Sequence, residues 1–491
     1  MLFQLPLVGV LPNWITFLLA VVDLVIRVAV VGIIPGNRRP TTAMAWLLAI
    51  FFIPTVGLLL FLMFGNFRLS RKRREQQQEV DEQVRALVAE SDGGEPASAF
   101  AGAEWLHSAS KLNQQLGALP MVDGNSVRLI PGYEDALAAM AEAVRNAKRF
   151  VNAEFYIMSS DELTDEFFAA LEEAAERGVE VRLLFDHIGT ARIRGYRGLL
   201  RRLRASKIQW RRMLPLLPLL GQWRRPDLRN HRKILVVDGE VAFTGSLNLI
   251  ERSYRNPRHR RAGRQWVELM ARLDGPAVTT LNVVFATDWL GETGQLLAEQ
   301  MAPPSAAGSV AAQVVPSGPA FANENNLRLF NTLIYSAQHR LSICSPYFVP
   351  DDSLLYAVTT AAQRGVHVEL FVSEQGDQFL VHHAQQSYYE VLLAAGVKIY
   401  RYPKPFVLHA KHFTVDDDVA VLGSSNMDMR SFSLNMEVSL MLPGAGIVAQ
   451  MRQVEDMYRK VSLPLDLEAW RSRPILSRYV DNVARLTATV Q

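Results

Sequence analysis

The stretch NHRKILVVDGEVAFTGSLN, residues 230–248, occurs a second time as LHAKHFTVDDDVAVLGSSN, residues 408–426. Both copies carry a histidine, a lysine, an aspartate, a glycine, a serine and an asparagine at identical spacing. The matched residues are His231, Lys233, Asp238, Gly245, Ser246 and Asn248 in the first copy and His409, Lys411, Asp416, Gly423, Ser424 and Asn426 in the second. A histidine and a lysine two positions apart on a strand point to the same face. One such pair alone would usually be ordinary surface or core, whereas six matched positions in two places indicate a duplicated functional site.

The residues around the two copies repeat as well. Between residues 134 and 186 the helical pattern EDALAAMAEAVRNAKR, the β-rich run FVNAEFYI, the helical pattern DEFFAALEEAAERG and the apolar run VEVRLLFD follow one another. Between residues 325 and 373 the order is the same, with NNLRLFNTLIYSAQHR, LSICSPYF, LLYAVTTAAQRG and VHVELFVS. Helices that alternate with apolar strands predict an α/β sandwich in each half. The expected organisation is a first half over residues 121–300, a linker over 301–313 and a second half over 314–491.

The matched residues resemble the HKD signature, H-x-K-x4-D-x6-G-S-x-N, of the phospholipase D superfamily. The likeness extends over residues 125–480. Further stretches are similar to the bacterial cardiolipin synthases, namely AWLLAIFFIPTVGLLLFLMFG, VVPSGP at 314–319, SPYFVPDDSLLYA and GSSNMDMRSFSLNMEV. The resemblance implies two phospholipase D-like α/β sandwich halves, related by pseudo-twofold symmetry, whose motifs meet in one active site. It also implies an N-terminal two-helix transmembrane hairpin before the two halves.

The residue types suit transfer of a phosphodiester. A phosphodiester is anionic, so its oxygens need fixed positive charge and hydrogen-bond donors. Lys233 and Lys411 supply the charge, and the motif asparagines and serines can supply donors. One histidine can attack phosphorus while the other protonates the leaving alcohol. The resemblance favours His231 as the nucleophile and His409 as the general acid and base. No metal and no cofactor is expected.

A carboxylate behind a catalytic histidine would fix its tautomer. Glu437, 28 positions after His409, matches the downstream acidic residue of the family. Glu268, which follows a longer basic insertion, is the best counterpart in the first half, with a surface glutamate as the alternative. Asp238 and Asp416 lie five residues past the lysines, at a strand end, and are interpreted as structural supports rather than acid–base groups.

Two apolar segments precede the duplicated unit, at residues 15–34 and 41–64. Each has about the 20 residues needed to cross a bilayer. The first contains Asp23 and Arg27, four positions apart and so able to pair on one helix face. We interpret them as a mutually neutralised pair facing the second helix, with an intramembrane polar site as the alternative.

The charges around these segments predict a topology. Arg38 and Arg39 lie between the two segments, whereas RLSRKRRE, residues 68–75, follows the second. The heavier basic flank is expected in the cytoplasm. The prediction is a multi-pass protein of the cell membrane, with residues 1–70 as its anchor, 71–120 as a polar helix and linker, and a cytoplasmic catalytic region.

A basic and apolar stretch leads to His231. Residues 191–230 mix arginines with Trp210 and Trp223, and Met213–Leu220 is almost wholly apolar. This pattern favours insertion at an anionic membrane surface. The alternatives are a solvated helix with a buried loop, and a nucleic-acid groove. If the first interpretation holds, replacing Leu216 and Leu217 by Asp lowers activity on vesicles.

The composition fits a membrane enzyme. Of the 491 residues, 49% are hydrophobic, and the single cysteine, Cys344, excludes an intramolecular disulfide framework. The predicted function is a membrane-anchored phosphatidyltransferase that makes cardiolipin and glycerol from two phosphatidylglycerol molecules through a phosphohistidine. Its expected partners are phosphatidylglycerol and an anionic membrane surface, with no nucleic acid. The alternatives are a phospholipase D that yields phosphatidic acid, a membrane-tethered nuclease of the superfamily and a non-catalytic scaffold. Phosphatidylethanolamine as a donor and the oligomeric state stay open.

Overall fold

The computed structural model describes residues 12–36, 38, 40–65, 103–117, 119–216, 225–297, 300–321 and 324–488. The chain divides into two compact units, Met1–Arg68 and Leu69–Gln491. The basic flank at residues 68–74 and the polar stretch up to residue 102 lie outside the described residues.

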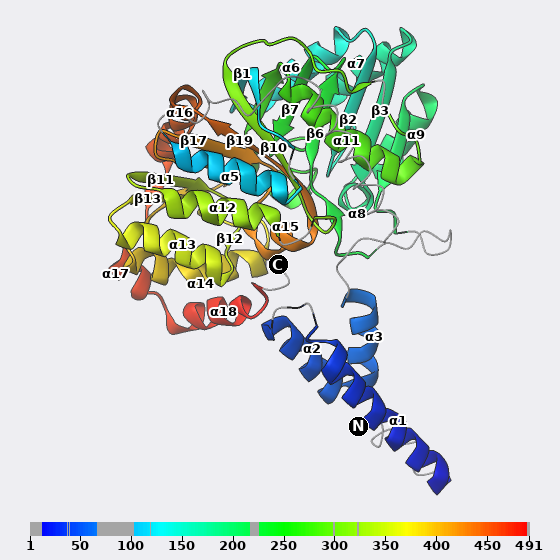
Figure 1. Cartoon of the computed structure of the whole chain (residues 1–491), viewed down its shortest axis with the longest axis vertical. Coiled ribbons are helices and arrows are strands. Elements are labelled where there is room, and N and C mark those ends of the chain that lie inside the picture. The colour runs from blue at the N-terminus through cyan, green and yellow to red at the C-terminus, as the bar shows by residue number, and fades with distance from the viewer. Residues whose placement is uncertain are drawn as a thin grey trace. The chain divides into compact units, whose positions relative to one another are not determined.

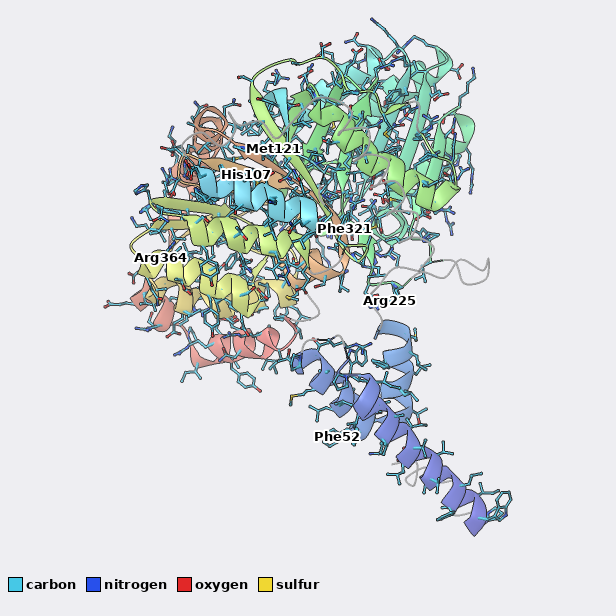
Figure 2. All side chains as sticks on the ribbon, viewed as in Figure 1. Phe52, His107, Met121, Arg225, Phe321 and Arg364 are labelled. Carbon is cyan, nitrogen blue, oxygen red and sulfur yellow. The ribbon has the colours of Figure 1, made fainter. Side chains whose placement is uncertain are left out.

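The described residues of the N-terminal unit form three apolar helices, α1 (Asn13–Ile33), α2 (Pro40–Phe52) and α3 (Pro54–Phe64). Within α1, the 20 residues Trp14–Ile33 have a mean hydropathy of 2.4 and the length to cross a membrane. Large apolar side chains of this unit are exposed, including that of Phe52 at the end of α2 (Figure 2). A surface of this kind is compatible with a lipid environment.

The expected second span at residues 41–64 is not one helix. It breaks at Ile53 and Pro54, because proline has no N–H to continue the α-helical bonding. At 1.5 Å per residue, α2 and α3 are only about 20 Å and about 16 Å long, shorter than a hydrocarbon core of about 30 Å. Among the described residues, α1 is therefore the one helix long enough to span, and the expected two-span hairpin is not supported.

Helix α3 folds back along α2 (Figure 1). The rings of Trp46 and Phe61, fifteen positions apart, meet edge to face with centroids 5.6 Å apart. A Cβ on Gly57 would lie 2.5 Å from the carbonyl oxygen of Ala49, so the two helices approach this closely only with glycine here.

The predicted pair in α1 is confirmed. Arg27 Nε donates to Asp23 Oδ2 at 2.6 Å, and Arg27 Nη1 reaches the carbonyl oxygen of Phe51 in α2 at 3.4 Å. The pair thus faces the next helix, as the sequence indicates.

The second unit is built on one 16-stranded sheet. Read outward from the central strands, the first half runs β1-β9-β7-β6-β2-β3-β4 and the second runs β10-β19-β17-β16-β11-β13-β14-β20. Strands β1 and β10 pair with each other and join the halves. The strands of the first half are β1 (Val122–Ile130), β2 (Phe150–Phe155), β3 (Glu180–Asp186), β4 (Gln209–Met213), β5 (Arg229–Asn230), β6 (Lys233–Val237), β7 (Val241–Gly245), β8 (Gln265–Val267) and β9 (Met270–Asp274). The strands of the second half are β10 (Val310–Ser317), β11 (Arg340–Cys344), β12 (Phe348–Val349), β13 (His367–Ser373), β14 (Lys398–Tyr402), β15 (Phe406–Leu408), β16 (His412–Val415), β17 (Val419–Gly423), β18 (Met427–Asp428), β19 (Asn435–Pro443) and β20 (Leu463–Pro464).

Helices pack on this sheet, as the alternating pattern predicts. Those before the linker are α5 (Glu104–Gln115), α6 (Tyr133–Arg145), α7 (Asp165–Glu176), α8 (His187–Ala191), α9 (Tyr196–Ala205), α10 (Pro257–Arg261) and α11 (Ala277–Thr293). Those after it are α12 (Asn325–Ser336), α13 (Asp352–Gln363), α14 (Phe379–Ala394), α15 (Met429–Ser433), α16 (Ala445–Val461), α17 (Leu467–Arg471) and α18 (Ile475–Arg485). The repeated RGV runs end α7 and α13, where Gly178 and Gly365 adopt φ of +93° and +94°. Glycine is favoured at this position because it takes a left-handed conformation without strain.

Two boundaries differ from the sequence-based expectation. Helix α5 falls in the stretch expected to be a polar helix and linker, but its Leu106 and Ala109 are buried in the core of the second half. Figure 1 shows α5, α12 and α13 side by side. Strand β10 begins at Val310, within the stretch expected to be a linker. The segments expected to be linkers therefore contribute a strand to the sheet and a helix that packs on it.

Candidate active site

Each motif histidine is held by the opposite half. The backbone N–H of His231 donates to the carbonyl of Met436 at 2.8 Å, and that of His409 donates to the carbonyl of Val267 at 2.7 Å. The short strands beside them pair across the halves too, β5 with β19 and β15 with β8, both in parallel. The structure therefore brings the two motifs together at one place.

The histidine–glutamate pairs are crossed between the halves. Nδ1 of His231 lies 3.0 Å from Oε2 of Glu437, and Nδ1 of His409 lies 2.8 Å from Oε1 of Glu268. Both glutamates are buried, so Glu268 is not the surface residue that was the alternative. The sequence order pairs each glutamate with the histidine of its own half, and the structure reverses this.

The charges of these pairs are set by burial and by each other. Burial lowers the pKa of His231 to about 4 although Glu437 opposes the shift, and burial also lowers the pKa of His409. Burial favours the neutral form of each glutamate, but the partner histidine, with neighbouring lysine charge, outweighs it and lowers the pKa of Glu437 and Glu268. For His231 the consistent state is a neutral ring that donates Nδ1–H to the Glu437 carboxylate, which leaves the Nε2 lone pair free for reaction.

Two buried lysines lie beside the histidines. Lys233 Nζ donates to the carbonyl of its own motif's His231 at 2.5 Å, and Lys411 Nζ does the same to His409 at 2.6 Å. Burial lowers the pKa of Lys233 to about 7 and that of Lys411 to about 8, and each lysine's charge is partly offset by Glu437 and Glu268. An incoming phosphate anion would favour their charged forms.

The motif asparagines differ in the hydrogen bonds that they make. Asn248 accepts from the N–H of Ile157 at 3.2 Å and donates to Tyr254 Oη at 2.9 Å. Asn426 is also buried, and its Oδ1 has no hydrogen-bond partner among the described residues. The structure thus engages the first amide internally and leaves the second less constrained.

The motif serines contact the strands that carry the glutamates. Ser246 Oγ accepts from the N–H of Leu269 at 3.0 Å, and Ser424 Oγ accepts from that of Val438 at 3.0 Å. Ser424 also donates its hydroxyl hydrogen to Glu437. Their observed contacts therefore hold the glutamates in position, beside the donor role that the motif predicts.

The motif aspartates bind backbone rather than the histidines. Asp238 accepts from the N–H groups of residues 148, 149 and 150 at 2.7–2.9 Å. Asp416 accepts from those of residues 338, 339 and 340 at 2.7–2.8 Å. Each carboxylate anchors the start of the strand next to its motif, β2 or β11, which agrees with the interpretation as supports.

Sequence reasoning missed the tyrosines around the site. The ring of Tyr156 meets that of His231 at 4.9 Å between centroids, with Lys233 Nζ 5.5 Å from the same ring. The ring of Tyr347 lies 6.1 Å from that of His409. Tyr254 Oη lies 3.5 Å from Glu268 Oε1. The sequence did offer a signal for Tyr156 and Tyr347, because they lie in the matching runs FYI and PYF of the two halves.

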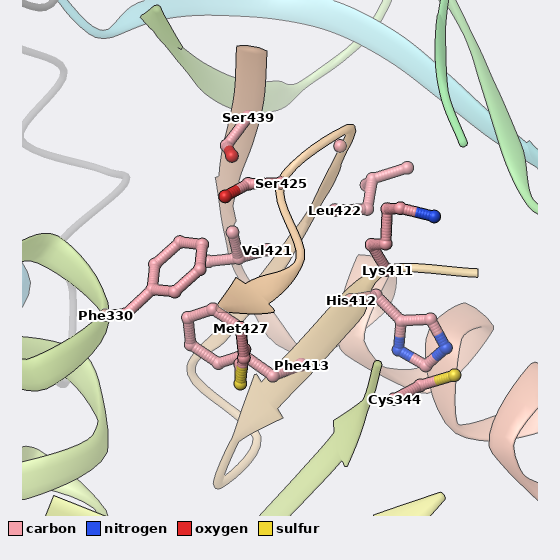
Figure 3. Close-up of a pocket in the computed structure, with 11 residues that line it drawn as sticks. Phe330, Cys344, Lys411, His412, Phe413, Val421, Leu422, Ser425, Met427 and Ser439 are labelled. Carbon is pink, nitrogen blue, oxygen red and sulfur yellow. The ribbon is translucent and has the colours of Figure 1, made fainter. Parts of the chain in front are cut away.

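A small cavity lies behind Lys411, lined among others by Cys344, His412 and Ser425 (Figure 3). Its volume is about 10 Å³, roughly the space of one water-sized sphere, so it cannot admit a lipid headgroup. Burial lowers the pKa of His412 to about 3. This third histidine next to the second motif therefore belongs to the supporting core.

The basic and apolar stretch before His231 is only partly described. Met213 and Leu214 are fully buried against Phe285 and Trp289, which corrects the expectation that they insert into lipid. The backbone N–H of Leu216 donates to His187 Nδ1 at 3.0 Å. Residues 217–224, with the other leucines and Trp223, lie outside the described residues. Insertion of residues 217–224 at a membrane surface stays a prediction.

Comparisons with known proteins agree with this geometry. A family described as "Cardiolipin synthase, PLD-like domain" matches residues 140–289 and 330–457, and one described as "Phospholipase D-nuclease N-terminal" matches residues 17–66. Cardiolipin synthase A of Yersinia pseudotuberculosis serotype O:1b (strain IP 31758) is 34% identical over 468 residues, which cover 92% of this chain and 93% of that protein. Cardiolipin synthase A of Yersinia pestis bv. Antiqua (strain Angola) shows the same values.

A solved structure shares the fold. The phosphatidylserine synthase of Haemophilus influenzae Rd KW20 matches with a TM-score of 0.59 and 15% identity, over 78% of this chain and 99% of that one. At this identity the likeness concerns the α/β fold alone.

Proposed function

Because the chain belongs to the cardiolipin synthase family of the phospholipase D superfamily, we propose that it makes cardiolipin and glycerol from two phosphatidylglycerol molecules. The family is one of phospholipid phosphatidyltransferases. The observation that carries the finer proposal is the pair of crossed histidine–glutamate contacts beside two buried lysines. They supply one nucleophile, one proton carrier and positive charge for a single phosphodiester.

The reaction proceeds in two displacements. Nε2 of neutral His231 attacks the phosphorus of the first phosphatidylglycerol. His409 enters this step as the imidazolium, which Glu268 stabilises, and gives its Nε2 proton to the glycerol oxygen as the P–O bond breaks. The product of this step is a phosphatidyl group on His231 and free glycerol. His409 then removes a proton from the terminal hydroxyl of a second phosphatidylglycerol, whose oxygen attacks phosphorus and releases His231. Glu437 and Glu268 hold the two rings in the tautomers that these steps need.

Exclusion of water would favour transfer over hydrolysis. His231 is 8% exposed and His409 5% exposed, so little solvent reaches either ring. A second lipid that covers the opening would reduce this further.

The two halves are proposed to be related by pseudo-twofold symmetry, with α1 as a membrane anchor in the cell membrane and the catalytic unit on the cytoplasmic side. The matching strand orders outward from β1 and β10 support the symmetry. The apolarity of α1 and the match at residues 17–66 support the anchor. The bilayer would then provide both the phosphatidylglycerol and the anionic surface.

The test is reconstitution of the full chain into vesicles with labelled phosphatidylglycerol, with wild type compared with His231→Ala and His409→Ala. Cardiolipin plus glycerol from wild type, and neither from the variants, is the expected result. Phosphatidic acid as the main lipid product would favour a phospholipase D instead. No histidine-dependent lipid product at all would contradict both, and cleavage of a nucleic acid by the same preparation would favour the nuclease.

A further inference from the structure

A surface pocket outside the two-histidine site is lined almost wholly by arginine. It has a volume of about 360 Å³ and is lined by Arg194, Arg255, Pro257, Arg260 and Arg261. Two separate segments form it: the link between α8 and α9, and the basic insertion after Tyr254. A Cβ on Gly195 would lie 2.7 Å from Nη1 of Arg255, which shows how closely the two segments meet.

Hydrogen bonds position some of the pocket's arginine side chains, but few carboxylates neutralise their charge. Arg255 Nη1 donates to Ser159 Oγ at 3.2 Å and to the carbonyl of Ser160 at 2.8 Å. Arg260 Nη2 lies 3.3 Å from Glu251 Oε1. Among the described residues, Arg194 and Arg261 make no ion pair with a carboxylate, and both are exposed. The pocket thus presents several guanidinium groups, of which that of Arg260 is paired with the Glu251 carboxylate.

The second half of the catalytic unit has no such insertion. Phe432, at the position of Tyr254, is followed five residues later by Glu437, whereas Tyr254 precedes Glu268 by fourteen. The added residues carry most of the pocket's arginines. Because the second half folds without these inserted residues, the fold itself does not require them. The arginine pocket is therefore a feature of the first half alone.

We propose that this pocket binds the phosphate group of an anionic ligand, at a site separate from the motif histidines. Arginine presents planar, multiple donors that match phosphate oxygens. The pocket is tied to the active site through Ser159, whose N–H donates to the carbonyl of Leu249, next to Asn248, at 2.7 Å. A phosphodiester headgroup and free phosphate share this chemistry. Phosphatidylglycerol as the probe rests on the proposed function, whereas phosphate recognition does not.

The test measures binding by the full chain in neutral detergent micelles, in a His231→Ala/His409→Ala background that prevents turnover. The variant Arg194→Gln/Arg261→Gln is compared with Arg128→Gln/Arg478→Gln, which removes the same charge from exposed arginines outside the pocket. The pocket variant should bind labelled phosphatidylglycerol about tenfold more weakly, while the control is unchanged. Competition by millimolar inorganic phosphate would assign the site to free phosphate, and lack of competition would assign it to the lipid headgroup. Equal binding of both probes by the two variants would overturn the proposal, whatever the outcome of the product assay.

A second inference concerns the N-terminal unit. Arg38, before α2, donates through Nη2 to the carbonyl of Gly65, after α3, at 3.0 Å. Its guanidinium also lies 4.9 Å from the centroid of the Phe61 ring. The two ends of the apolar segment 40–65 therefore lie next to each other, and the chain turns between them at Ile53 and Pro54.

We propose that α2 and α3 form a re-entrant hairpin that enters and leaves the membrane on one side, while α1 alone crosses it. A backbone carbonyl at the turn needs a partner in lipid, and Arg27 of α1 supplies a donor to Phe51. Arg27 is in turn neutralised by Asp23. The half-buried ion pair thus has a specific use at the turn of the hairpin.

The distribution of basic residues supports this topology. Residues 1–12 contain no lysine or arginine, whereas Arg38, Arg39 and the basic run at 68–74 flank the hairpin. With two full spans, Arg38 and Arg39 would be on the opposite side from that run. With a re-entrant hairpin, all of these basic residues are on the cytoplasmic side, as the positive-inside rule favours.

The test places single cysteines in the full chain, in a Cys344→Ser background, and labels them with a membrane-impermeant maleimide in cells with a permeabilised outer membrane. Pro12→Cys should be labelled with the inner membrane intact. Gly36→Cys and Asn66→Cys should both be labelled only after that membrane is broken. Labelling of Gly36→Cys and Asn66→Cys from opposite sides would establish two full spans and overturn the proposal. Labelling of all three from one side would overturn it as well.

Discussion

The two halves of the catalytic unit carry the same six motif residues in different surroundings. The residue between the histidine and lysine is Arg232 in the first half and Ala410 in the second. Arg232 is buried and forms an ion pair with Asp288. On the neighbouring strands, Glu154 lies opposite Ile234, while Cys344 lies opposite His412.

The difference extends to the carboxylates behind the histidines. Glu268 has Tyr254 near it, whereas the corresponding residue of the second half, Phe432, has no hydroxyl. Glu437 accepts the hydroxyl hydrogen of Ser424. Duplication therefore fixed the reacting groups, and divergence of the supporting residues made the two histidines inequivalent. The proposed roles of nucleophile and proton carrier call for such a difference between the two histidines.

The largest expected effect comes from the crossed glutamates. Glu437→Gln and Glu268→Gln should each lower kcat by about 10²–10⁴-fold, because the amide can turn its NH₂ group to Nδ1 and stabilise the wrong tautomer. The measurement is initial rate of product formation in vesicles. Glu240→Gln, an exposed glutamate in the turn after Asp238, is the matched control and should keep full activity. Retention of activity in Glu437→Gln would show that His231 does not depend on the opposite half.

The two motif lysines should lose their charge at different pH values, which distinguishes the two halves. A lysine with a lowered pKa is charged below that value and loses its charge as pH rises through it. Because the pKa of Lys233 is about 7 and that of Lys411 about 8, the alkaline fall of kcat/KM should begin with Lys233. Lys233→Arg should move the fall upward towards pH 8, and Lys411→Arg should leave it near pH 7, since arginine stays charged. An identical profile in both variants would assign the fall to a histidine instead.

The motif aspartates should act on stability, and equally in the two halves. Asp238→Ala and Asp416→Ala each remove an acceptor of three backbone N–H groups. The expected loss is about 2–4 kcal/mol of unfolding free energy in either variant, measured by denaturant titration of the detergent-solubilised chain. The rate per folded molecule should stay near that of wild type. A large loss of rate without loss of stability would make these residues part of the chemistry.

The smallest expected effect concerns Tyr254. Tyr254→Phe should lower kcat by about 2–10-fold, because Asn248 loses its hydroxyl partner and Glu268 a nearby donor. Phe432→Tyr is the reciprocal change and should not raise the rate, since it adds a hydroxyl without the same contacts. Equal responses of the two variants would mean that this difference between the halves has no role in catalysis.

Much of the site could be predicted because its residues lie in a short, repeated pattern. The strand-borne His and Lys of each motif were recognisable from the repeated spacing, and the resemblance to the family pointed to Glu437 and, as its counterpart, Glu268. The crossing of Glu437 to His231 was not, because it depends on the pairing of β5 with β19, which are about 200 residues apart. The contact of Asn248 with Tyr254 was hidden for another reason, because the matching residue of the second half is Phe432, whose side chain has no hydroxyl, so the repeat gives no signal for it.

The fold was predictable where periodicity was strong. The helices and strands of the two repeats, such as α7 and β3 or α13 and β13, lie where the pattern places them. The N-terminal unit was different, because hydropathy counts apolar residues and does not register a reversal of direction. Pro54 and Gly57 were compatible with a continuous membrane helix, and contacts such as that of Trp46 with Phe61 reveal the turn. Burial of Leu106 in the second half was likewise not visible in a stretch of mostly polar residues.

The most direct measurement is identification of the residue that carries the phosphatidyl group during turnover. The full chain would be mixed with labelled phosphatidylglycerol, quenched within the first turnover in alkali, where phosphohistidine is stable, and digested for mass spectrometry. The account predicts the label on the peptide that contains His231, still formed in Glu240→Gln and absent in His231→Ala. Label on His409, or normal cardiolipin production by His231→Ala, would contradict it.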